Sequence, residues 1–75
     1  MTRLPRVSGR QCCGALGKVG FRLVREHGSG IVLRRLDPFA RVVVPDHREF
    51  DRGTLRAILR HAGVGVEGFE RLLAG

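Results

Sequence analysis

The 75-residue sequence has no tryptophan, no tyrosine, only two cysteines and no long apolar run. A membrane-spanning helix needs about 18 or more consecutive apolar residues, so the sequence excludes a transmembrane protein. Its first residues also lack the charged-then-apolar pattern of a secretory signal peptide. We therefore expect one small domain over residues 1–75, located in the cytoplasm.

The two cysteines, Cys12 and Cys13, are adjacent in the sequence. A disulfide requires a Cα separation that consecutive residues do not easily reach, and two cysteines alone match no zinc-binding spacing. We expect reduced thiols, with Cys12 facing the core. No two of the three histidines have the spacing of metal ligands, and Asp46-His47 has no third ligand beside it. The sequence predicts neither a metal site nor a cofactor.

Positive charge is what the chain has in excess. Fourteen Lys and Arg residues oppose seven Asp and Glu, which gives a net charge of +7, and only Lys18 is a lysine. This charge density indicates an anionic partner, either nucleic acid or an acidic protein. A simpler alternative stays open at this point: the arginines are hydrated surface residues that bind no partner.

A first helix is predicted between Ser8 and Gly20. Ser8 and Gln11 have the spacing of a capping box, in which each side chain bonds the other residue's backbone amide. Gly20 is the expected C-terminal stop. Apolar residues at helical spacing form the buried face: Cys12, Ala15, Leu16 and Val19.

The pattern then changes to that of strands, over residues 21–25, 31–36 and 41–44. His27-Gly28-Ser29 and Asp37-Pro38 are the expected turns, and Pro45 ends the third strand. Short connections favour an antiparallel meander, with one face packed on helices and the other bearing arginines.

Two helices are predicted to follow the strands. Asp51 is expected to cap the first and Gly63 to end it. Its buried stripe comprises Leu55, Ile58, Leu59 and Ala62, and a short last helix is marked by Val66, Phe69, Leu72 and Leu73. The order predicts an α+β fold in which one three-stranded antiparallel sheet packs on helices.

Five segments also occur in a characteristic order between Val7 and Leu73. They are Val7-Ser8-Gly9-Arg10, Gly20-Phe21 leading into Arg22-Leu23-Val24-Arg25, Gly28-Ser29, Val42-Val43-Val44-Pro45, and Gly53-Thr54-Leu55-Arg56-Ala57-Ile58-Leu59-Arg60-His61-Ala62-Gly63. Together they resemble the HicA (YcfA-like) family of bacterial mRNA interferase toxins.

The resemblance implies a fold like that of a double-stranded-RNA-binding domain, α-β-β-β-α, here with a short extra C-terminal helix. It further implies the toxin of a type II toxin–antitoxin system: a metal-free endoribonuclease that inhibits translation by cleaving mRNA. The implied partners are mRNA as substrate and a HicB-like antitoxin protein.

In that family the residue after Gly-Ser is a histidine with an implied catalytic role, whereas this chain has Gly30. Metal-free RNA cleavage removes a proton from the 2′-hydroxyl and gives one to the leaving 5′-oxygen. Imidazole can do either near neutral pH, and losing such a group typically costs about 10²–10⁴ in rate. The resemblance therefore implies impaired activity in this chain.

Three explanations of Gly30 stay open: an engineered replacement, natural loss that leaves a binding-only protein, and compensation by His27. The sequence places His27 in the turn, where it is more simply an exposed loop histidine. Ser29 either donates a hydrogen bond to phosphate or only forms the turn. His61 suits the C-terminal end of a helix as a cation, and His47 is expected in a solvated loop.

The candidate RNA-binding residues are basic residues of the first helix and the sheet: Lys18, Arg22, Arg25, Arg34 and Arg35. Such phosphate contacts supply affinity and salt dependence but little sequence reading. Phe21, Phe50 and Phe69 are expected to pack in the core or in loops, so base stacking is not predicted. Two alternatives to a nuclease remain: a non-catalytic RNA-binding module, and a protein-interaction domain that binds an acidic partner.

Overall fold

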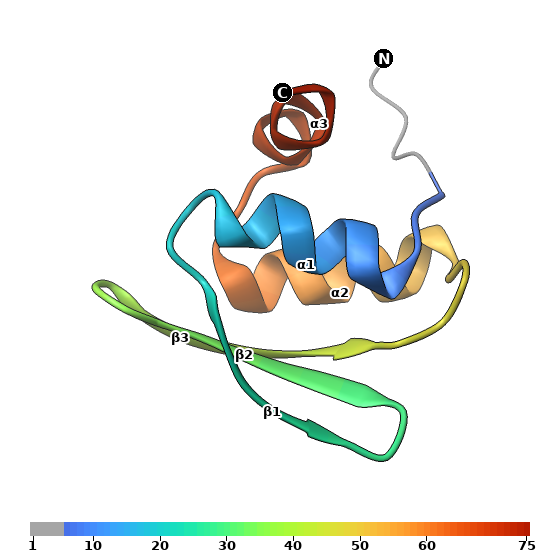
Figure 1. Ribbon diagram of the computed structural model, residues 1–75. Coiled ribbons are helices and arrows are strands. Elements are labelled where there is room, and N and C mark those ends of the chain that lie inside the picture. Colours follow the sequence, from blue (N-terminus) through green and yellow to red (C-terminus); the bar gives the residue numbers. More distant parts are fainter. Residues whose placement is uncertain (1–5) are drawn as a thin grey trace.

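A computed structural model describes residues 6–75 and has the predicted α+β architecture (Figure 1). The elements in chain order are α1 (Gly9–Gly17), β1 (Arg22–His27), β2 (Gly30–Leu36), β3 (Phe39–Pro45), α2 (Arg52–Ala62) and α3 (Val66–Ala74). Residues 1–5 of the predicted domain lie outside the described residues. Within residues 6–75, no helix is long and apolar enough to cross a membrane.

The sheet is the predicted antiparallel meander, with strand order β1-β2-β3. Figure 1 shows α1 and α2 over the same face of the sheet, while the opposite face carries no helix. α3 packs on α1 and α2 and lies farther from the sheet, at the top of the view. The molecule thus has one covered and one uncovered sheet face.

Helix ends follow the predicted caps. The Ser8 hydroxyl accepts a hydrogen bond from the Gln11 amide (3.1 Å), and the Gln11 side chain accepts one from the Ser8 amide (2.9 Å). The Asp51 carboxylate accepts a bond from the Thr54 amide (2.7 Å), which lowers the pKa of Asp51 below its ordinary value. Gly63 ends α2 with a φ of 72°, in the left-handed conformation that favours glycine.

The first helix is shorter than predicted. α1 ends at Gly17, so Val19 lies in the following turn and is half-buried rather than part of the helical face. Two glycines, Gly14 and Gly17, weaken the end of this helix because glycine costs about 1 kcal/mol relative to alanine. Gly20, with a φ of 98°, turns the chain toward the sheet.

The first hairpin differs from the prediction at both strands. Phe21 precedes β1 and is buried in the core, while His27 is the last residue of β1 and pairs with Gly30. The turn is therefore Gly28-Ser29 alone. Gly28 has a φ of 59° and Ser29 a negative one, as expected for a two-residue type II′ turn that closes a hairpin tightly. The prediction that His27 lies in the turn was wrong.

The third strand also begins earlier than predicted, at Phe39. The core lies between the helices and the covered face of β2 and β3. It comprises Val7, Cys12, Ala15, Leu16, Phe21, Ile31, Leu33, Val42, Val44, Phe50, Leu55, Ile58, Leu59, Ala62 and Phe69. By contrast, every residue of β1 is exposed, so β1 is an edge strand held mainly by its pairing with β2.

Candidate functional site

The uncovered face of the sheet is the candidate site, and strand alternation decides which side chains it carries. Ile31, Leu33, Val42 and Val44 face the helices, so the alternate residues of β2 and β3 point the other way. Residues that pair across strands share a face, which extends the assignment to the part of β1 that follows its irregularity, at Arg25 and His27. We define the open face as Arg25, His27, Gly30, Val32, Arg34, Leu36, Phe39, Arg41, Val43 and Pro45.

Arginines dominate the middle of the open face. Arg34 of β2 lies directly opposite Arg41 of β3. An irregularity in β1 between Leu23 and Arg25 places Arg25 opposite Val32. None of the open-face residues is acidic, and no hydrogen bond or ion pair within residues 6–75 occupies these three guanidinium groups.

This arrangement costs stability in the free protein, because like charges directly opposite each other in a sheet repel. An acidic side chain at either position would have removed the repulsion. The nearest acidic residue of β1, Glu26, instead pairs with Ile31 and lines a groove with Cys13 on the helix side. An anion from outside the chain would relieve this repulsion.

The predicted RNA-binding residues divide into two groups. Arg35 is held by the protein: its guanidinium lies 4.8 Å from the centre of the Phe21 ring and donates to the carbonyls of Pro38 (3.0 Å) and Ala62 (3.2 Å). Lys18 donates through Nζ to the carbonyl of Leu72 (2.6 Å). The structure does not bring these two residues to the open face.

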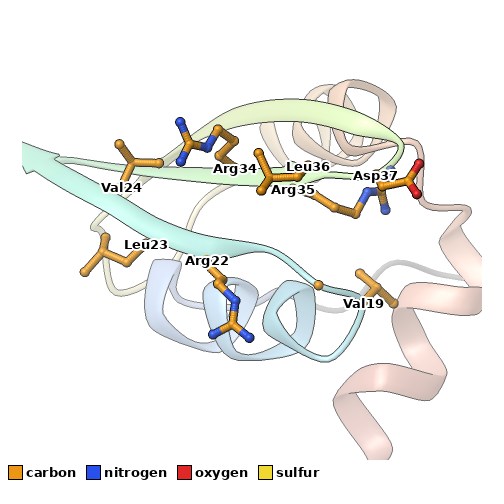
Figure 2. A pocket seen from close by; sticks show the side chains of 9 residues that line it. Val19, Arg22, Leu23, Val24, Arg34, Arg35, Leu36 and Asp37 are labelled. Carbon is orange, nitrogen blue, oxygen red and sulfur yellow. The ribbon is translucent and has the colours of Figure 1, made fainter.

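Arg22, Arg25 and Arg34 remain exposed. Arg22 and Arg34 are Cα partners, but Figure 2 shows their side chains extending away from each other at a depression of about 310 Å³ beside Val19. Of the predicted set, Arg25 and Arg34 are thus the residues that share the open face.

One end of the open face is the row His27, Gly30 and Pro45. A Cβ atom added at Gly30 would meet Val43 Cγ1 at 3.1 Å, so position 30 points onto the open face. Ser29 is exposed in the adjoining turn, and its carbonyl accepts a hydrogen bond from the Asp46 amide (2.6 Å). That bond ties the tip of the hairpin to the end of β3.

The other end of the open face is apolar. Phe39 and Leu36 are paired across β2 and β3 and are 68% and 72% exposed. Phe39 and Arg41 were not predicted from the sequence, because three consecutive valines do not show which face of the strand is buried. In the structure the burial of Val42 and Val44 places Arg41 and Phe39 on the outward face. An exposed aromatic ring beside arginines offers a surface on which a base can stack.

A groove of about 460 Å³ continues from the edge of the open face, between β3 and α2. Arg41, Val43 and Pro45 line it from the strand, and Thr54, Ala57, Ile58 and His61 line it from the helix. His61 therefore lies in a groove beside the sheet as well as near the end of α2. His47 is exposed in the loop after β3.

Neither cysteine is suited to catalysis. Both are free, and burial together with the neighbouring Cys13 raises the pKa of the Cys12 thiol to about 12. Burial and the Asp46 carboxylate also raise the pKa of Cys13. Because the thiolate is the nucleophile, two thiols protonated at neutral pH supply none. In the described part of the chain, no group of three or more His, Cys, Asp or Glu residues could hold a metal ion.

Comparison with protein-family models matches residues 9–64 to the HicA toxin of bacterial toxin–antitoxin systems. The matched segment includes every residue of the open face and ends before α3. The chain belongs to the HicA toxin family. It is thus a toxin of the toxin–antitoxin type, and the resemblance seen in the sequence is confirmed. A search of curated proteins gives no match.

Proposed function

We propose that this HicA-family toxin is an endoribonuclease that binds mRNA on the open face and cleaves it without a metal ion, which stops translation. The observation that carries the proposal is the opposed pair Arg34 and Arg41, with Arg25 on the same face and no acidic residue among them. Its action on mRNA would take place in the cytoplasm.

RNA suits this face for electrostatic and geometric reasons. A phosphate backbone supplies the negative charge that relieves the repulsion between the arginines, and guanidinium groups bind phosphate oxygens through two parallel hydrogen bonds. Phe39 adds an exposed ring for stacking a base. Contacts of this kind read backbone and shape more than sequence.

The antitoxin that pairs with this toxin is proposed to be HicB-like and to cover the same face. A net charge of +7 and an arginine-rich open face fit an acidic surface on the partner. Covering the open face would block RNA and neutralise the toxin in one step.

The binding proposal is tested with the double variant Arg34→Ala/Arg41→Ala and short single-stranded RNA titrated at several salt concentrations. Each lost phosphate contact is expected to flatten the slope of log affinity against log salt by about 0.7. The matched control is Arg56→Ala/Arg60→Ala, which removes the same charge from exposed positions of α2. Equal losses in both variants would contradict a site on the open face.

A second candidate function is a binding-only protein, and Gly30 is the observation that favours it. A glycine offers no group for proton transfer at the position that the family resemblance marks as catalytic. Incubating labelled RNA with the purified chain in the presence of a chelator distinguishes the two. Tight, salt-sensitive binding without cleavage products would support the binding-only function and contradict the nuclease.

A further inference from the structure

We propose that His27 of β1 is the catalytic residue of this chain. Its side chain lies on the open face beside position 30 of β2, where the family resemblance places the catalytic histidine. The inference rests on the proposed nuclease function. Its basis is the cross-strand pair of His27 with Gly30, which places an imidazole and an empty position side by side.

The pairing fixes where the imidazole is presented. His27 ends β1, Gly30 begins β2, and the Gly28-Ser29 turn joins them with no further residue. Directly opposed residues of an antiparallel pair have Cβ positions about 5 Å apart and project from the same face. The His27 side chain therefore projects onto the open face next to the vacancy at Gly30.

The missing side chain at Gly30 leaves room for that imidazole. A ring opposite a glycine can lie across the glycine backbone, as aromatic residues do in sheets. On the other side Val43 already approaches, since a Cβ at position 30 would be 3.1 Å from its Cγ1. A side chain at position 30 would therefore have to displace Val43, whereas the glycine leaves that place open to the ring of His27.

The imidazole is also free to react. His27 is exposed, and none of the hydrogen bonds or ion pairs among residues 6–75 involves its side chain. Arg25 lies two residues earlier on the same face, about 7 Å along the strand. A phosphate beside His27 is therefore within reach of a guanidinium that can stabilise the charge developing at phosphorus.

The other histidines are less well placed. His61 projects from α2 into the groove beside β3, and its nearest open-face neighbours are Arg41 and the apolar Val43 and Pro45. His47 belongs to the loop after β3, where its carbonyl accepts a bond from the Gly9 amide at the start of α1. His27 is the one histidine among the open-face residues.

The proposed step is cleavage by the RNA's own 2′-oxygen. Neutral His27 takes the proton of the 2′-hydroxyl, the 2′-oxygen forms a bond to phosphorus, and the bond from phosphorus to the 5′-oxygen breaks. The departing 5′-oxygen takes a proton from water, and the imidazolium returns its proton to the solvent. The products are a 2′,3′-cyclic phosphate and a 5′-hydroxyl, with no metal or cofactor consumed.

The test compares four proteins on labelled single-stranded RNA in a chelating buffer: the unaltered chain, His27→Ala, His47→Ala and Gly30→His. The unaltered chain is expected to cleave, and His27→Ala to cleave about 10²–10⁴-fold more slowly, with unchanged RNA affinity. Added imidazole should restore part of the His27→Ala rate. His47→Ala, an exposed histidine of a loop, should cleave like the unaltered chain, and RNA methylated at the 2′-oxygen should resist cleavage.

Each other result overturns a specific claim. Equal rates for His27→Ala and the unaltered chain would remove the role of His27 and leave the nuclease standing. An inert unaltered chain whose Gly30→His variant cleaves RNA would also remove it, and would support the binding-only function for this chain on a fold that is able to cleave RNA. If neither protein cleaves RNA, the nuclease function itself fails, together with the role of His27.

Discussion

Arg34 and Arg35 are consecutive residues of β2, yet they belong to two different surfaces. Arg35 lies on the covered face, over the Phe21 ring and bonded to two carbonyls. Arg34 lies on the open face opposite Arg41 and has no partner within the described residues. Arginine therefore stabilises the fold on the covered face, whereas on the open face it has no internal partner among the described residues.

Val43 and Val44 of β3 show the same contrast for apolar residues. Val44 is fully buried under the helices, whereas Val43 is 57% exposed on the open face. A strand with two such unlike faces is expected where one face packs on the core and the other faces solvent. Core packing and the proposed RNA binding therefore depend on different residues of this small sheet.

The largest expected effect comes from Val44→Ala. Removing two buried methyl groups from the core is expected to lower the free energy of unfolding by about 2–3 kcal/mol, from lost transfer energy and the cavity left behind. Val43→Ala should change it by less than about 0.5 kcal/mol. Chemical denaturation of both variants measures the difference. Similar losses would mean that the open face is packed like the covered one.

A smaller effect is expected from Arg35→Ala, which loses the ring contact, two hydrogen bonds and the packing of the side-chain stem. The free energy of unfolding should fall by about 1–2 kcal/mol. Arg34→Ala should leave the free energy of unfolding unchanged or raise it by roughly a few tenths of a kcal/mol, because it removes the repulsion with Arg41.

Arg35→Lys provides the control for charge. A lysine keeps the positive charge but loses the planar fork that reaches the Pro38 and Ala62 carbonyls together. Its stability should fall between those of the natural chain and Arg35→Ala. If Arg34→Ala proved the more destabilising of the two alanine variants, the assignment of the two faces would be reversed.

Much of the fold that creates the covered and open faces could be predicted from the sequence. The caps at Ser8 and Asp51 follow from local chemistry, and the β-branched run Val42-Val43-Val44 predicts a strand. Local patterns therefore gave the element order, the meander and the exposure of Arg34. Three consecutive valines do not show which of them is buried, so the outward orientation of Arg41 did not follow from the sequence.

The internal hydrogen bonds of Arg35 and Lys18 could not be predicted in the same way. Their partners are remote in sequence: Ala62 lies 27 residues from Arg35, and Leu72 lies 54 residues from Lys18. Such contacts depend on how α2 and α3 dock against the rest of the fold. From the sequence alone, a basic residue near the sheet is therefore predicted to contact a ligand, and only the structure shows a partner within the protein.

The position of His27 depended on one detail of register. A three-residue turn would have left it in the loop, whereas the observed Gly28-Ser29 turn makes it the strand partner of Gly30. Both turns are compatible with the glycine-rich sequence, since each needs a residue with positive φ. The bulge that brings Arg25 onto the open face is likewise set by pairing rather than by local sequence.

The smallest expected effect is that of Gly30→Ala, which tests how freely the open face can move. Position 30 does not have a positive φ, so alanine should gain about 0.4–1 kcal/mol from reduced freedom of the unfolded chain. The close approach to Val43 Cγ1, 3.1 Å from the new Cβ, opposes this gain. Because Val43 is exposed, it can shift, and the net change should stay within about 0.5 kcal/mol.

Thermal unfolding of Gly30→Ala beside Gly14→Ala measures this balance. Gly14 lies exposed in α1 with nothing within 4 Å of an added Cβ, so its alanine variant should be stabilised by about 1 kcal/mol. A loss above about 1 kcal/mol in Gly30→Ala would show that Val43 is held in place. The open face would then be rigid at the end where His27 and Gly30 lie, and packing would exclude a larger side chain at position 30.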